Sequence, residues 1–185
     1  EELDKKINLV IGQLLERFEI QARKKVKNFP FLMGQGVWMD SDKLDWEDEI
    51  REVLKHGTLS MGFIGLAECL KALTGKHHGE SEESQNLGLE IVGYMRKRMD
   101  EASSKYGMNF TLLATPAEGT CGKFVKLDRK MFGCLEGITD REYYTNSFHI
   151  PVYYELSAFD KIRLEAPYHE LTNAGPITYV EMDGD

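Results

Sequence analysis

Apolar residues recur at three- and four-residue intervals in two long stretches of the chain, which predicts amphipathic helices there. The first stretch ends near Asn28, just before Pro30, and its apolar stripe consists of Leu3, Ile7, Val10, Leu14, Phe18 and Ala22. The second begins near Ser81, a residue type that caps helix N-termini, and stops at Gly107. Its inner face consists of Leu87, Ile91, Tyr94, Met95 and Met99, with Arg98 at the rim.

Three shorter helices follow from local start and stop signals. The stretch DWEDEIREVLKHG, residues 45–57, predicts a compact helix with Asp45 as its cap and a glycine as its stop. Residues 65–73 predict a second helix, which also ends at a glycine. The third starts at the Ser157 cap. It is expected to break before Pro167, because proline lacks the N–H that a helix interior needs.

Apolar stretches bounded by glycine or proline predict three strands, over residues 58–63, 108–114 and 177–182. Strands that alternate with helices are typical of βα units with parallel strands. No linker, repeat or low-complexity tract is visible, so we expect a single α/β unit over residues 1–185. The loop over residues 29–44, FPFLMGQGVWMDSDKL, has an apolar body that packs on a core edge or lines a cofactor pocket. The packed loop is the favoured reading.

The composition and charge exclude several classes of protein. The chain has 185 residues, of which 42% are hydrophobic and 29% charged, as in an ordinary globular domain. Its net charge of −8 repels nucleic-acid backbones, so no nucleic-acid partner is expected. The densest basic run, residues 23–27, is interpreted as the positive end of the first helix. No apolar run has membrane-spanning length and no signal-peptide pattern is present, so no membrane partner is expected either.

Cysteine and histidine residues offer two weaker sites. Cys69, Cys121 and Cys134 form no CxxC pair, which predicts no zinc framework and fits a reduced, cytoplasmic setting. We expect Cys69 in the core and Cys134 on a partly exposed loop. Cys121 with His149 as its base is a candidate nucleophile for a cysteine-dependent transferase. No nucleophile elbow surrounds it, so a small buried residue is favoured.

The adjacent pair His77–His78, with Glu80 nearby, suggests a metal site. Neighbouring residues on a loop do not easily ligate one ion together, and no further ligand cluster accompanies them. A solvated loop tip is therefore the favoured interpretation, and no metal site is predicted.

The stretch LLATPAEGTCGKF, residues 112–124, carries the stronger candidate. A strand delivers its carboxyl end into it, and a helix that begins near Ala117 aims free backbone N–H groups at that end. Such a helix N-terminus binds anions, a glycine permits close approach, and the threonines add donors, although Glu118 repels a phosphate beside it. A routine turn capped by a threonine is the alternative. The candidate anion-binding residues are Thr115, Pro116, Ala117, Glu118, Gly119 and Thr120.

A second polar segment, REYYTNSFHIPV, covers residues 141–152 and is dense in side-chain donors. These donors either bind a polar ligand, with Asn146 and Ser147 as a wall of the site, or satisfy the backbone of their own turn. The residues alone do not separate the two readings.

Four motifs taken together resemble one family. GTLSMGFIGLAECLKALTG, LLATPAEGTCGKF, GITDREYYTNSFHIPV and KIRLEAPYHELTNAGPITYVE occur in this order and at similar spacing in anaerobic (class III) ribonucleoside-triphosphate reductases. FPFLMGQGVW is similar to the upstream part of the same pattern. The resemblance extends from about Asn28 to Glu181, nearly the whole chain, and four unusual motifs in order make it highly specific.

The resemblance implies an oxygen-sensitive glycyl-radical enzyme that reduces ribonucleoside triphosphates to their deoxy forms with formate as reductant. It implies a ten-stranded α/β barrel like that of pyruvate formate-lyase, around a finger loop with a radical cysteine. The segment 115–118 is similar to the family's substrate-phosphate loop. The family further implies a zinc site, a homodimer and a radical-SAM iron-sulfur activase as partner.

The chain also departs from the family pattern. It lacks the regulatory cone, the finger-loop cysteine, the paired CxxC motifs of the zinc site and the glycyl-radical motif. No catalytic residue is therefore assigned, and no cofactor is expected in this chain. We expect an internal piece of the reductase that is inactive in isolation. A stand-alone nucleotide-binding or regulatory module is the alternative.

Overall fold

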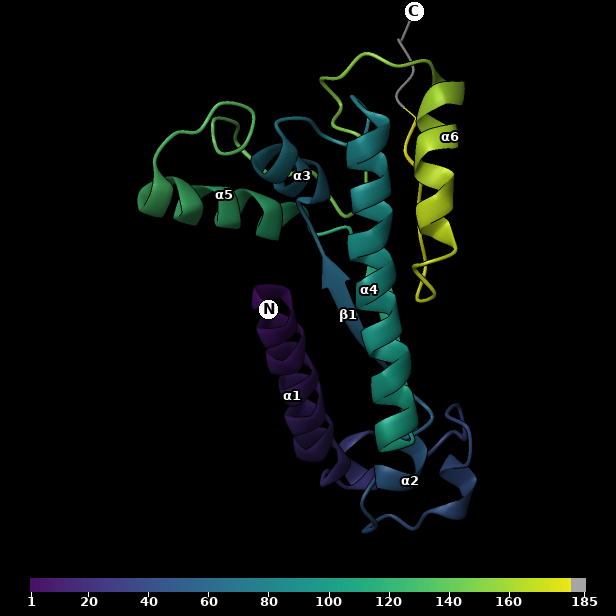
Figure 1. Ribbon diagram of the computed structural model, residues 1–185. Helices are drawn as coiled ribbons and strands as arrows, with labels where there is room; N and C mark the ends of the chain where they lie inside the picture. The colour runs from purple at the N-terminus through teal and green to yellow at the C-terminus, as the bar shows by residue number, and fades with distance from the viewer. Residues whose placement is uncertain (181–185) are drawn as a thin grey trace, which may run out of the picture. The chain divides into compact units, whose positions relative to one another are not determined.

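The computed structural model describes residues 1–180, and Figure 1 shows its elements. The contacts divide the chain into two units: residues 1–61 with 98–111, and residues 62–97 together with the described residues from 112 onward. A single unit was expected from the sequence. No linker marks the division, because the boundaries fall inside two strands and one long helix, which is why composition does not reveal them.

The first unit begins with α1, Glu2–Ala22, which is followed by a short 3-10 turn, Val26–Asn28. The predicted helix near the N-terminus is therefore confirmed, but it ends about one and a half turns earlier than expected. Four residues of α1 are buried: Ile7, Ile11, Phe18 and Ala22. The other predicted stripe positions, Leu3, Val10 and Leu14, are half-buried. The buried face of α1 therefore includes Ile11, which was not predicted, and is centred slightly to one side of the predicted apolar face.

The loop over residues 29–44 packs on a core, as the favoured reading predicted. Met33 is buried with Val26, Ile50 and Val53, and Phe29, Trp38 and Leu44 pack against this cluster. The rings of Phe29 and Trp38 stack with their centroids 6.2 Å apart. A second 3-10 turn, Ser41–Lys43, follows within the loop.

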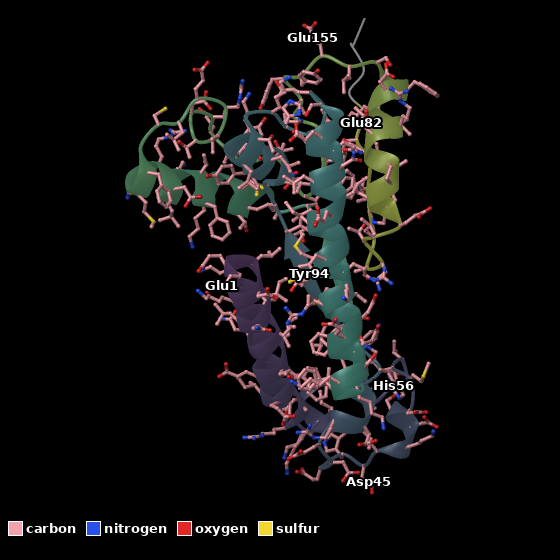
Figure 2. The ribbon with its side chains drawn as sticks, in the orientation of Figure 1. Glu1, Asp45, His56, Glu82, Tyr94 and Glu155 are labelled. Atoms are coloured by element: carbon pink, nitrogen blue, oxygen red, sulfur yellow. The ribbon has the colours of Figure 1, made fainter. Side chains whose placement is uncertain are left out.

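The compact helix predicted over residues 45–57 is wrong in extent, because only α2, Arg51–Leu54, is helical. Figure 2 labels Asp45 and His56 near the ends of the segment. Asp45 does not cap a helix; its backbone N–H donates to the Asp48 side chain at 2.8 Å. The carbonyls of residues 46 and 48 accept the N–H groups of residues 27 and 26, and the N–H of residue 50 donates to the carbonyl of residue 24. Tertiary pairing therefore replaces the first helical turns.

Two strands form the sheet, β1 (Thr58–Phe63) and β2 (Asn109–Ala114), as the sequence predicted. The side chains of Thr58 and Asn109 meet at 2.9 Å, and those of Ser60 and Thr111 meet at 2.9 Å, so the strands run in parallel. The crossover between them contains α3, Leu66–Thr74, and the long α4, Glu82–Tyr106. Both predicted helices are confirmed.

The third predicted strand, residues 177–182, does not form over residues 177–180, and residues 181–182 lie outside the described part. The carbonyl of Tyr179 accepts from the Lys161 side chain at 2.7 Å rather than from a strand. Residues 173–174 bond the backbone of Leu112 instead: Leu112 N–H donates to the Asn173 side chain, and Ala174 N–H donates to the Leu112 carbonyl, both at 3.0 Å.

The second unit also contains α5, Glu118–Phe132, and α6, Ala158–His169. Ser157 caps α6 as predicted, since its hydroxyl accepts from the Asp160 N–H at 3.1 Å. The expected break before Pro167 is wrong, because α6 continues to His169. The next residue, Tyr168, is fully buried, stacks on Phe148 at 5.2 Å and donates its hydroxyl to Gln85 at 3.1 Å. This packing outweighs the one hydrogen bond that proline removes.

Candidate phosphate-binding site

The N-terminus of α5 lies directly after β2. The strand ends at Ala114, a three-residue turn contains Pro116, and α5 starts at Glu118. The Ala117 carbonyl accepts the N–H groups of Thr120 and Cys121, both at 2.9 Å, which closes the first helical turn. The predicted strand, turn and helix start are therefore confirmed.

Two backbone donors at this terminus are available. The N–H groups of Glu118 and Gly119 have no hydrogen-bond acceptor among the residues that the structure describes. No side chain caps α5, and the Thr115 hydroxyl turns back to the Leu113 carbonyl at 3.4 Å. The threonine cap of the alternative interpretation is therefore absent, although the turn marked by Pro116 does form. Unpaired N–H groups at a helix N-terminus, with the positive end of the helix dipole, favour an anion.

An open depression of about 410 Å³ continues from this terminus along α5. Its lining consists of Glu118, Gly119, Gly122, Lys123, Lys126, Leu127 and Lys130. A Cβ atom added at Gly119 meets no heavy atom within 4 Å, so a ligand can approach the backbone there. The sequence reasoning missed the three lysines. These lysines are three and four positions apart, which places them on one face of a helix. This spacing is the sequence pattern from which they could have been predicted.

Asn146 is brought to the α5 terminus, and Ser147 is not among the residues that line the depression. The Asn146 side-chain oxygen accepts the Ala117 N–H at 3.0 Å and the Cys121 thiol at 3.1 Å. Ser147 is buried, has a φ of 41° and leaves its hydroxyl without a partner in the described part of the chain. Only one of the two predicted wall residues therefore contacts the candidate site.

The polar side chains of the 141–152 segment bond distant elements rather than their own turn. The Tyr144 hydroxyl donates to Asp128 of α5 at 2.8 Å. Thr145 donates its N–H and its hydroxyl to Glu68 of α3, at 2.9 and 2.6 Å. Burial raises the pKa of Tyr144, and the neighbouring Asp128 carboxylate raises it further. These hydrogen bonds link the segment to both α3 and α5.

The geometry opposes an activated Cys121. This side chain is 1% exposed, as the favoured reading expected, and burial raises the pKa of its thiol. A nucleophilic cysteine needs a lowered pKa. His149, the suggested base, pairs with the buried Glu165 at 3.2 Å instead. Cys134 is exposed as expected, whereas Cys69 is exposed and its predicted core position is wrong.

His77 and His78 are each 1% exposed, so the predicted solvated loop tip is wrong. The His78 ring bonds the Phe148 carbonyl at 2.7 Å, and His77 lies edge-on to Tyr154 at 4.7 Å. Among the described residues, no group of three or more His, Cys, Asp or Glu side chains is arranged to hold a metal ion. Within the same part of the chain, no helix is long and apolar enough to cross a membrane.

The model of one protein family, described as anaerobic ribonucleoside-triphosphate reductase, matches residues 1–185. The chain belongs to this family. The anaerobic ribonucleoside-triphosphate reductase of Salmonella typhimurium is 36% identical over 182 residues, which are 97% of this chain and 25% of the relative. The reductase of Enterobacteria phage T4 is 33% identical over 181 residues, 97% of this chain and 28% of the relative. The chain thus spans about a quarter of the length of these reductases.

Solved reductase structures share the fold. The crystal structure of the anaerobic ribonucleotide reductase from Thermotoga maritima matches with a TM-score of 0.66 at 18% identity, over 94% of this chain and 26% of that one. A further anaerobic ribonucleotide reductase structure matches with the same TM-score at 19% identity, over 94% of this chain and 25% of that one. The α/β class predicted from the sequence is confirmed.

Proposed function

We propose that this chain is the part of an anaerobic ribonucleotide reductase that holds the phosphates of a ribonucleoside triphosphate. The parent enzyme reduces this substrate to the deoxyribonucleotide by radical chemistry. The observation that carries the proposal is the α5 N-terminus, where the N–H groups of Glu118 and Gly119 are unpaired beside an open, lysine-lined depression. Family membership supplies the substrate class.

The charges along α5 suit a chain of phosphates. The helix N-terminus provides backbone donors, and the depression continues past Lys123 and Lys126 to Lys130. Lys126 follows Gly119 by seven positions, which is about 10 Å along a helix axis. A chain of phosphates along this distance lies beside the backbone N–H groups at the helix N-terminus and then beside the ammonium groups of the lysines. Glu118 opposes the anion at one point of the rim, so we assign the main attraction to the backbone and the lysines.

Holding the phosphates serves the reaction by orientation. Binding energy from a part of the substrate that does not react fixes the ribose relative to the reacting groups. The role proposed for the residues of this chain is to bind the phosphates and to orient the substrate. A glycyl radical, formate and zinc belong to the proposal for the parent, as do the ten-stranded barrel, the homodimer and the iron-sulfur activase. The described residues offer no cluster that fits zinc, so no zinc ligand is assigned to them.

A stand-alone nucleotide-binding module is not favoured, because the relatives that match 97% of this chain are named as reductases. The 185-residue chain by itself is expected to form no deoxynucleotide. Activity of the purified chain after anaerobic incubation with activase and formate contradicts this expectation.

The loop assignment is tested in the full-length reductase with Gly119→Val, which blocks close approach to the backbone, and with Thr120→Ala. Both variants are expected to raise the KM for the ribonucleoside triphosphate and to leave base preference unchanged. Gly93→Val is the matched control, because a Cβ atom at Gly93 also meets nothing within 4 Å, and Gly93 lies on α4, away from this loop in the sequence. An unaltered KM in both loop variants removes this loop from the substrate site.

A further inference from the structure

Glu68 is a buried carboxylate in the first turn of α3 with no ion-pair partner within 4 Å among the described residues. Its side chain is 5% exposed. One carboxylate oxygen, Oε1, accepts both the N–H and the hydroxyl of Thr145, at 2.9 and 2.6 Å. The other oxygen, Oε2, is buried and has no hydrogen-bond partner within the described part of the chain.

The N-terminus of α3 favours a negative charge, but a carboxylate buried there remains a costly way to fill a core. A buried charge with an unsatisfied oxygen loses hydration that its contacts do not fully replace, and an apolar side chain of similar volume packs there at lower cost. Burial accordingly raises the pKa of Glu68. Its two short hydrogen bonds to one residue instead fix the position of that residue with high directionality.

The contacts of Thr145 and Asn146 show what is being fixed. The Gly65 N–H, at the start of α3, donates to the Thr145 carbonyl at 2.7 Å, so α3 holds Thr145 from both its backbone and its side chain. Asn146 pairs with Ile64 as an antiparallel bridge. From this position, the Asn146 side-chain oxygen accepts the Ala117 N–H at the α5 terminus.

We propose that Glu68 is a positioning residue for the substrate-phosphate site, acting through Thr145 and Asn146 on the N-terminus of α5. Asn146 satisfies the Ala117 N–H and leaves the next two N–H groups, of Glu118 and Gly119, for the ligand. Without Glu68, the Thr145–Asn146 segment keeps its backbone contacts with Gly65 and Ile64 but loses both bonds to the Glu68 carboxylate, and the α5 terminus is then held less firmly. The link to substrate rests on the proposed function; the link from Glu68 to the α5 terminus does not.

The experiment measures both links in the full-length reductase with Glu68→Ala, Glu68→Gln and Thr145→Val. One readout is KM and kcat for the ribonucleoside triphosphate. The other is the alkylation rate of Cys121, followed by mass spectrometry of its peptide, because the Cys121 thiol shares the Asn146 oxygen and is buried with it. Glu90→Gln on α4, which removes an exposed carboxylate, is the control.

Glu68→Ala is expected to raise KM and to accelerate Cys121 alkylation, each about tenfold, with a smaller effect on kcat. Glu68→Gln restores most of both values, since its amide oxygen still accepts from Thr145. Thr145→Val removes one of the two hydrogen bonds and is expected to raise KM and the Cys121 alkylation rate about threefold each. This milder variant keeps the test available if the alanine variant does not fold. Glu90→Gln behaves as the natural sequence.

Cys121 alkylation that stays at its natural rate in Glu68→Ala overturns the positioning role, whatever KM does. Equal defects in the alanine and glutamine variants also overturn it, because a hydrogen-bonded anchor is rescued by an acceptor of the same shape. Faster alkylation with an unchanged KM supports the positioning of α5 and counts against the phosphate site. The two proposals therefore fail in different ways.

Discussion

The backbone N–H of Ala117 donates to the side-chain oxygen of Asn146 at 3.0 Å, across 29 positions of sequence. This bond occupies the first free donor of the α5 terminus with a neutral acceptor. The same oxygen accepts the Cys121 thiol, so one amide group holds two points of the first helical turn. The next N–H groups, of Glu118 and Gly119, remain for a ligand. A charge introduced at position 146 therefore tests whether that ligand is an anion.

Asn146→Asp is expected to keep the shape and both hydrogen bonds while placing a negative charge at the α5 terminus. Repulsion between this charge and the substrate phosphates raises the KM for the triphosphate, by about tenfold at low salt. Steady-state kinetics of the full-length reductase at two salt concentrations measures the effect, which shrinks as salt screens the charge. A KM that matches the natural enzyme at low salt places the phosphates away from Asn146.

Reversing the charge of Lys123 or Lys126 is expected to weaken triphosphate binding. Lys123→Glu and Lys126→Glu each place a carboxylate in the depression along α5, and we expect each to raise KM about tenfold or more. Lys76→Glu makes the same charge change on an exposed residue of the same unit that does not line the depression, and serves as control. Equal effects of all three variants on KM contradict a localised site and indicate general charge repulsion.

Gly62 on β1 lies against Thr115, so Gly62→Ala is expected to destabilise the fold. A Cβ atom there overlaps the Thr115 hydroxyl and comes within 2.9 Å of the Thr115 Cβ, which forces the turn before α5 to move. We expect a loss of about 1–3 kcal/mol in the free energy of unfolding, measured by urea denaturation. Adding Thr115→Ala removes the hydroxyl overlap and recovers part of the loss. If Gly62→Ala is as stable as the natural sequence, the turn before α5 accommodates the added methyl group without cost.

His78 is expected to make stability fall in mild acid. Burial lowers its pKa from 6.5 to about 4, although the bond to the Phe148 carbonyl opposes the shift. The unfolded chain therefore binds a proton between pH 6.5 and 4 that the folded chain does not. Stability is fully present above pH 6.5 and is lost as the pH falls toward 4. The loss at pH 5 is on the order of 2 kcal/mol.

The measurement compares urea denaturation of the 185-residue chain at pH 8 and pH 5 with that of His78→Gln. Glutamine does not titrate, so the variant loses less stability between the two pH values, by about the amount assigned to His78. His77, whose pKa is also lowered by burial, remains in both proteins. An identical pH dependence of the two proteins excludes His78 as the source.

The sequence by itself determined the features that depend on neighbours along the chain. Periodicity and glycine stops placed α3 and α4, and Gly75 and Gly107 adopt φ values of 84° and 63° that favour glycine there. The β2 strand, the Pro116 turn and the start of α5 were likewise readable, as were the motifs that indicated the family. These are short-range signals, because helix periodicity, capping and turn chemistry act within a few residues.

Only the tertiary structure decided the features that depend on residues distant in sequence. Backbone pairing with residues 24–27 shortened the helix predicted over 45–57, and the burial of Tyr168 carried α6 past Pro167. The Glu68–Thr145 bond spans 77 positions, and the burial of His77 and His78 is equally non-local. Local patterns carry no information on such pairings, because they are set by which surfaces exclude water together after the elements have formed.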